Sequence, residues 1–191
     1  MQAAMISRRA FTCRLVAIPA ALGTAAGALA APGNEPGAAL PAADGLSHSA
    51  ETIRQEMSFD ASRRRVYQAL TVAKQFDAVT RLSDAVALVN APGAKPTTIS
   101  GAVGGSFTLF GGYITGRHLE LVPGERLVQA WRAASWQPGD HSVVRFDLVE
   151  NGPGTRIVLA HRGFPEGAGA HLAAGWHSHY WEPLTMFLAR G

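Results

Sequence analysis

The pattern of hydrophobic and polar residues first becomes regular at residue 52. From there to residue 59 the side chains alternate with a period of two, and one of the two series consists of Ile53, Gln55, Met57 and Phe59. This alternation predicts a half-buried β-strand. Two candidate N-caps, Asp60 and Ser62, then precede a predicted helix with Val66, Ala69 and Leu70 on one face and a second short helical piece through Phe76.

Beyond residue 80 the pattern changes to strands separated by turns. Gly-Gly, Pro-Gly and Asn-Gly-Pro-Gly sequences mark the breaks, as hairpin connections require. The predicted strands cover residues 85–89, 106–110, 113–122, 126–133, 142–150 and 155–162. Apolar and charged residues alternate in the last two of them, so we expect a sheet with one dry face and one wet face.

The closing segment, residues 169–188, provides a cover for the dry face. Helical spacing relates Leu172, Trp176, either Pro183 or Leu184, and Phe187. This spacing predicts a long C-terminal helix, which Pro183 should kink or weaken. A chain of 191 residues is long enough for one domain rather than two. We therefore predict an α+β domain over residues 51–191, in which an antiparallel sheet wraps around the C-terminal helix and two short helices follow the first strand.

The first thirty residues differ in composition from the rest of the chain. Their charged residues are Arg8, Arg9 and Arg14, and an uncharged run rich in Ala and Gly ends in a small-x-small sequence. These features predict a signal peptide cleaved between Ala30 and Ala31 rather than a membrane span. The sequence Ser-Arg-Arg-Ala-Phe resembles the twin-arginine signal, which implies a bacterial protein exported folded to the periplasm without a remaining membrane anchor. Residues 31–50, rich in Ala, Pro and Gly, predict a flexible linker.

Charge and cysteine content exclude several function classes. The chain has 17 Lys and Arg residues against 14 Asp and Glu residues, and removal of the three signal arginines leaves the mature chain neutral. A neutral domain lacks the electrostatic footprint of a nucleic-acid binder. Cys13 is the one cysteine and lies within the predicted signal, so the mature chain has no thiol nucleophile and no Cys-ligated zinc. The Gly-Gly pairs are not phosphate loops, and we predict neither a metal nor a cofactor.

Several linked motifs resemble one known family. They are Gly116-Arg117, Pro123-Gly124-Glu125-Arg126-Leu127-Val128, Trp131-Arg132, Gly154-Thr155-Arg156, His161-Arg162-Gly163-Phe164-Pro165 and Gly175-Trp176. In this order they are similar to the activator of Hsp90 ATPase homologue family, within the helix-grip superfamily of START domains and the birch pollen allergen. Ser135-Trp136-Gln137-Pro138-Gly139 and Tyr180-Trp181 resemble the C-terminal domain of the eukaryotic co-chaperone. The resemblance implies a helix-grip fold and a cavity between sheet and helix, which in this superfamily often receives apolar small molecules.

Histidines are the candidate residues for acid/base or metal chemistry. His161 ends an inward-facing alternation near Phe164, where it would bond a ligand oxygen or act as a general base. We favour a structural role, because the sequence shows no nucleophile or carboxylate partner for it. His171, His177 and His179 do not predict a metal site, because 177 and 179 point to nearly opposite sides of a helix.

Aromatic residues are the candidate ligand contacts. Large amphipathic rings are expected around the cavity and its lid, from Trp131, Trp136, Trp176 and Trp181 together with Tyr180. Core packing is the alternative role, which we favour for Trp131 and Trp176. Trp136 lies in a loop before Pro138-Gly139 and is the residue that we expect to contact a ligand or partner.

Three functions follow from these observations. The first is a periplasmic module that binds an apolar or aromatic small molecule between sheet and helix. The second is an enzyme of the polyketide-cyclase kind, with a cavity histidine as acid/base. The third is a chaperone-like protein-interaction module that acts through the exposed sheet and Trp136. We favour binding without catalysis.

Overall fold

The computed structural model describes residues 51–190. The predicted signal peptide, its cleavage point at Ala30 and Ala31, and the predicted linker 31–50 lie outside the described residues. Within the described part, no helix is long and apolar enough to cross a membrane.

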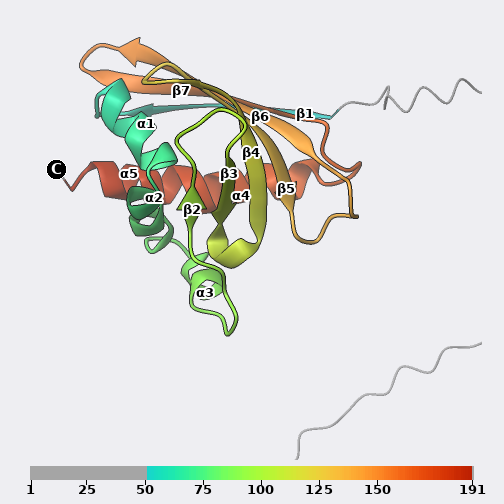
Figure 1. Ribbon diagram of the computed structural model, residues 1–191. Helices are drawn as coiled ribbons and strands as arrows, with labels where there is room; N and C mark the ends of the chain where they lie inside the picture. Colours follow the sequence, from blue (N-terminus) through green and yellow to red (C-terminus); the bar gives the residue numbers. More distant parts are fainter. Residues whose placement is uncertain (1–50, 191) are drawn as a thin grey trace, which may run out of the picture. The chain divides into compact units, whose positions relative to one another are not determined.

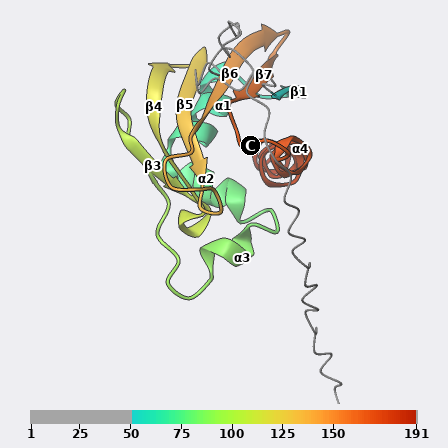
Figure 2. The ribbon, with the colours of Figure 1, turned by 90° about the vertical axis from the view of Figure 1, so that its right-hand side faces the viewer.

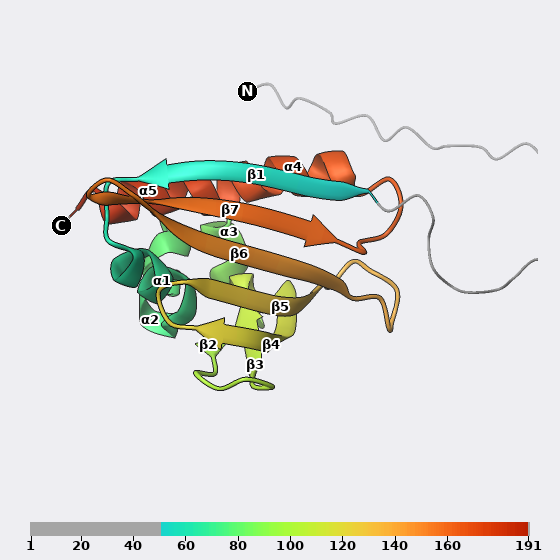
Figure 3. The same ribbon diagram turned by 90° about the horizontal axis from the view of Figure 1, so that it is seen from above.

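Seven antiparallel strands form one sheet in the order β1-β7-β6-β5-β4-β3-β2. Figure 3 shows β1, β7, β6, β5 and β4 side by side. The strands are β1 (Thr52–Phe59), β2 (Thr98–Ile99), β3 (Ser106–Leu109), β4 (Ile114–Val122), β5 (Arg126–Ala133), β6 (Ser142–Asn151) and β7 (Gly154–Arg162). The first strand therefore pairs with the last, and strands β3 to β7 follow one another as hairpins.

The helices gather on one face of this sheet. They are α1 (Arg63–Thr71), α2 (Ala73–Thr80), α3 (Val86–Val89), a 3-10 turn η1 (Phe110–Gly112), α4 (Gly169–Trp176), a π-helical turn η2 (His177–Trp181) and α5 (Glu182–Leu188). The segment from α4 to α5 runs along the sheet in Figure 1, and in Figure 2 it is seen end-on with the strands curving past it. The predicted α+β helix-grip architecture is confirmed.

Alternation along each strand produces the two faces of the sheet. In β5, Leu127, Gln129, Trp131 and Ala133 are buried, whereas the intervening residues are partly exposed. The same pattern in β6 and β7 directs Phe146, Ile157 and Leu159 into the core. Trp176, Trp181 and Leu184 from the C-terminal segment pack on this face and are at most 2% exposed. Burial of such large side chains contributes about 1.5–3 kcal/mol each.

One predicted element is wrong. Residues 85–89 form no strand, because Ala85 precedes the short helix α3. Backbone bonds from Val86 to Ser83 and from Leu88 to Ala85 close helical turns there. A short apolar run does not distinguish a strand from a helix by period alone, and here the sequence Ser-Asp before the run favours the turn. The two-residue strand β2 was not predicted.

Pro183 lies just beyond an irregular turn of the C-terminal segment. Residues His177–Trp181 form the π-helical turn η2, and α5 begins at Glu182 with the proline in its first turn. Proline has no N–H to donate, and its ring crowds the carbonyl one turn earlier. The weak point expected at Pro183 is therefore the π-helical turn η2, which lies just before the proline.

Gln55 ties the first strand to the C-terminal segment. Its Nε2 donates to the carbonyl oxygen of Ala173 at 2.9 Å, and its Oε1 accepts from Trp181 Nε1 at 2.5 Å. A polar side chain on the inner face of β1 is therefore satisfied by the helix that covers it, as buried amides require.

Candidate functional site

A cavity of about 120 Å³ lies between the C-terminal segment and the strands β4 and β5. Aromatic and aliphatic side chains dominate its lining. The lining residues are Ala85, Leu88, Phe110, Tyr113, Ile114, Trp131, Ala133, Ser135, Trp136, Ala168, His171, Leu172, Gly175, Trp176, His179 and Tyr180. No aspartate, glutamate, lysine or arginine occurs among these described residues, so the cavity wall is apolar with a few polar hydroxyl, indole and imidazole groups.

The cavity reaches the protein surface at a polar rim. Tyr113 is 37% exposed, and its hydroxyl lies 3.2 Å from the Oγ of the exposed Ser135 in a hydrogen bond. His171 is exposed and His179 is partly buried. Opposite the rim, Trp131, Trp176 and Tyr180 are at most 6% exposed. The space is therefore apolar at depth and polar where it opens.

Residues four apart along the helix form its side of the cavity. His171, Gly175 and His179 follow one another at that interval and all line the space. A Cβ added at Gly175 would meet a single neighbouring atom, His179 Cδ2, at 3.9 Å. The missing side chain of Gly175 thus leaves part of the cavity open, with an imidazole on each side.

Two buried nitrogens of lining residues lack a hydrogen-bond partner. They are Trp131 Nε1 and His179 Nδ1. Burial raises the pKa of the Tyr180 hydroxyl, and the nearby Trp131 indole lowers it in part. The distance and angles between the two groups do not meet the geometry of a hydrogen bond. A buried polar atom without a partner costs about 1–3 kcal/mol, so an external polar atom that reached either nitrogen would stabilise it.

His161 lies behind the cavity wall, in a complete hydrogen-bond chain. Trp176 Nε1 donates to His161 Nδ1 at 3.1 Å. Because Nδ1 accepts, the proton of the neutral ring is on Nε2, which donates to Ser142 Oγ at 2.7 Å. The serine hydroxyl in turn donates to the Trp131 carbonyl oxygen at 3.2 Å. Burial lowers the pKa of His161 to about 4, and the ring is 0% exposed.

The six predicted contact residues therefore divide into two groups. Trp131, Trp136, Trp176 and Tyr180 line the cavity. His161 and Phe164 do not, since the Phe164 ring packs against His161 at 5.0 Å on the other side of the wall. Contact of any of the six with a ligand stays a prediction. The sequence interpretation missed the lining residues His171, Gly175 and His179, although their spacing of four indicated a shared helix face.

Metal coordination receives no support within residues 51–190, where no group of three or more metal-ligating side chains occurs. His177 is exposed and its Nδ1 lies 3.3 Å from Glu182 Oε1, on a different side of the helix from the cavity-lining His179.

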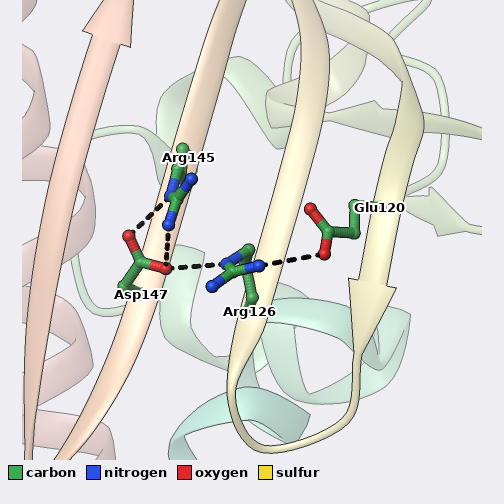
Figure 4. A network of polar contacts seen from close by, with 4 residues as sticks. All are labelled: Glu120, Arg126, Arg145 and Asp147. Atoms are coloured by element: carbon green, nitrogen blue, oxygen red, sulfur yellow. Dashed lines mark hydrogen bonds and ion pairs between the residues drawn. The ribbon is translucent and has the colours of Figure 1, made fainter.

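The outer face of the sheet carries a row of paired charges. Arg126 bonds both Glu120 and Asp147, and Arg145 contacts the same Asp147 through two nitrogens; Figure 4 shows this network across three strands. Partial burial raises the pKa of Asp147, but the bonds from the two arginines outweigh it and hold that pKa below its usual value. On the neighbouring strands, Glu56 accepts from two further arginines.

Comparisons with known proteins agree on one relationship. Residues 60–189 match the family described as "Activator of Hsp90 ATPase homolog 1-like protein". The human "Activator of 90 kDa heat shock protein ATPase homolog 1" is 27% identical over 104 residues, which are 54% of this chain and 31% of that protein. The chain thus spans about a third of the length of this relative.

Two solved structures share the fold. An HSP90 activator from Plasmodium falciparum superposes with a TM-score of 0.63 at 20% identity, covering 72% of this chain and 96% of that one. The Aha1 dimer from Colwellia psychrerythraea gives a TM-score of 0.56 at 19% identity, covering 74% and 99%. At these identities the likeness concerns the fold alone.

Proposed function

The chain belongs to the Activator of Hsp90 ATPase homolog 1-like protein family, and we propose that its domain binds an apolar or aromatic small molecule in the cavity beside the C-terminal segment. One observation carries the proposal: an apolar space that reaches the surface, left open by the absence of a side chain at Gly175. Ligand sites are concave and mostly apolar, with a few polar groups that orient the ligand, and this cavity has that composition.

Binding without catalysis is favoured by the state of His161. Both of its ring nitrogens are engaged within the protein, and its lowered pKa leaves it neutral at ordinary pH. A general base must reach the proton that it removes, but His161 does not line the cavity. A polyketide-cyclase-like reaction would have to use a different residue.

Export by the twin-arginine pathway is part of the same proposal. It rests on Arg8, Arg9 and the small-x-small sequence that ends at Ala30. The human relative is named as an activator of a heat shock protein ATPase, but an exported domain would be separated from a cytosolic partner. We therefore infer that this domain binds its small molecule in the periplasm.

Filling the cavity tests the binding function. A leucine at Gly175 would project into open space and would also favour the helix, where glycine costs about 1 kcal/mol. Gly175→Leu should therefore abolish binding of an apolar aromatic such as toluene without lowering the melting temperature. Ala174→Leu, at the adjacent exposed position, is the matched control and should bind as the parent does. Unchanged toluene binding in Gly175→Leu would refute this site.

A protein-interaction role is a second candidate, and the outer face of the sheet favours it. Alternation places seven arginines there against three carboxylates: Arg54, Arg117, Arg126, Arg132, Arg145, Arg156 and Arg162 against Glu56, Glu120 and Asp147. Val143 and Val149 lie on the same face and are at least 40% exposed. Arginine beside exposed apolar surface is typical of interfaces, and the excess positive charge fits an acidic protein surface.

Arg117 and Arg162 allow a test of this role, because neither is in an ion pair with a described carboxylate. The double variant Arg117→Ala/Arg162→Ala should weaken binding of a hexaglutamate peptide at low ionic strength. Arg81→Ala/Arg190→Ala removes the same number of charges just beyond the ends of helices α2 and α5, away from this face, and should have less effect. Equal weakening by both variants would indicate net charge rather than a docking face.

A further inference from the structure

We infer that the cavity selects a single-ring aromatic molecule that carries a hydrogen-bond-accepting oxygen, carbonyl or carboxylate, which lies against His179. The inference rests on the proposed binding function and names the class of ligand. It combines three properties of the described residues: the volume of the space, the type of its unpaired polar atoms, and the position of His179 between the apolar interior and the rim.

The volume limits the apolar part of the ligand to about one ring. The space encloses about 120 Å³, and an apolar cavity of about 150 Å³ accepts benzene. Drug-sized ligands occupy pockets of about 300–1,000 Å³. A fused polycyclic molecule would not fit without movement of the helix, whereas one ring fits and its substituent then extends toward the rim.

The shape of the interior favours a flat ring over an aliphatic chain. The rings of Trp131 and Trp176 have centroids 5.9 Å apart and planes tilted by 36°, and the Tyr180 ring centroid lies 4.3 Å from that of Trp176. Phe110 closes another side at 5.4 Å from Tyr180. Aromatic pairs prefer offset and edge-to-face contacts at such distances, so a guest ring would continue an existing aromatic cluster.

The unpaired polar atoms favour a ligand that accepts hydrogen bonds. The indole nitrogen of Trp131 is a donor and never an acceptor. His179 Nδ1 is buried without a partner and donates in the tautomer that carries its proton there. With no acidic side chain among the described lining residues, a ligand cation would find no counter-charge.

His179 is the group that reaches both regions of the cavity. It is partly buried, its ring lies 6.4 Å from that of the buried Phe110, and it stands one helical turn from Gly175, where the space is open. A ring placed in the aromatic interior would therefore direct its substituent past this imidazole toward the rim formed by Tyr113 and Ser135.

Calorimetric titration of the full-length chain with toluene, acetophenone and benzoate tests the inference. These molecules share one ring and differ in the oxygen group. We expect acetophenone or benzoate to bind at least tenfold more tightly than toluene, and the tighter of the two identifies a neutral or an anionic oxygen. The ratio of the toluene dissociation constant to that of the tighter oxygen-bearing molecule measures this preference. In His179→Phe the ratio should fall at least fivefold. His177→Phe makes the same change two positions earlier, on an exposed side chain outside the cavity, and should retain the ratio.

The outcomes separate this inference from the binding function on which it rests. If toluene binds and the oxygen-bearing molecules bind no more tightly, the inference is wrong and apolar binding stands. A ratio that survives in His179→Phe would also overturn it, because the oxygen would then lie elsewhere. If none of the three molecules binds, the proposed function itself fails.

Discussion

The indole Nε1 of Trp176 donates a hydrogen bond to Nδ1 of His161 at 3.1 Å, and this bond joins the C-terminal segment to β7, the last strand along the chain. Both side chains are at most 2% exposed. Because Nδ1 accepts this bond, the proton of the neutral His161 ring is on Nε2. Nε2 therefore donates to Ser142 Oγ. A tryptophan that lines the cavity therefore also holds the wall behind it.

Removal of the Trp176 ring should destabilise the domain strongly. Trp176→Ala deletes a buried indole and leaves a void, for which the expected loss in unfolding free energy is about 3–5 kcal/mol. Trp176→Phe keeps a ring but leaves His161 Nδ1 without its donor, so an intermediate loss is expected. Urea denaturation measures both. A midpoint for Trp176→Ala equal to that of the parent would show that this ring does not hold the core.

The free energy of unfolding should decrease as the pH is lowered through the range set by His161. The unfolded ring takes up a proton near its ordinary pKa of 6.5, whereas burial lowers the folded pKa to about 4. Between these values the unfolded state binds more protons, so the unfolding free energy decreases as pH falls, by up to roughly 1.4 kcal/mol per pH unit. Burial also lowers the pKa of His118, which adds to the same trend.

Denaturation curves from pH 7.5 to 4.5 check this dependence. His161→Gln should reduce the slope, because it removes one titrating group while retaining polar atoms. His177→Gln, the same substitution at an exposed histidine, is measured beside it for comparison. Equal slopes in the parent and in His161→Gln would mean that other groups cause the acid sensitivity.

Replacement of Trp136 should affect binding more than folding. Its half-buried ring packs edge-to-face on Trp131 at 5.4 Å and lines the open side of the cavity. Loss of such a pair costs about 0.5–1.5 kcal/mol. We expect Trp136→Ala to weaken acetophenone binding about tenfold, measured by calorimetry, with a small decrease in melting temperature. An unchanged acetophenone affinity would contradict a role in binding.

The export proposal has its own test. Arg8→Lys/Arg9→Lys keeps the charge of the signal but removes the twin arginines, so the precursor should accumulate in the cytoplasm. Cell fractionation and the N-terminal sequence of the exported form, expected to begin at Ala31, are the measurements. Normal export of the lysine variant would argue against the twin-arginine pathway.

Local periodicity was sufficient to predict most of the sheet. The bounds predicted for β5, 126–133, agree with the structure because each buried residue alternates with a more exposed one. The same reasoning failed at 85–89, where five apolar residues in a row fit a helix turn as well as a strand. Periodicity identifies an element when both of its faces are marked by different residue types.

The site was less predictable than the fold. Trp131, Trp136, Trp176 and Tyr180 are large rings, and size alone suggested them. The bond between the Tyr113 and Ser135 hydroxyls depends instead on strand register, because Ile114 pairs with Ala133 across β4 and β5, and no local pattern encodes that pairing. Gly175 contributes by having no side chain, and the sequence alone does not show that the space beside it is empty.

The bonds of Gln55 have a consequence for the order of folding. This residue lies in the first strand, yet both of its partners, Ala173 and Trp181, belong to the final segment, and its strand pairs with β7 about a hundred residues later. Such long-range closure is slow and has to wait until residues as late as Trp181 have been synthesised. A nascent chain that has not extended past Trp181 lacks residues that complete its core, so the domain should reach its native state only after this segment has left the ribosome.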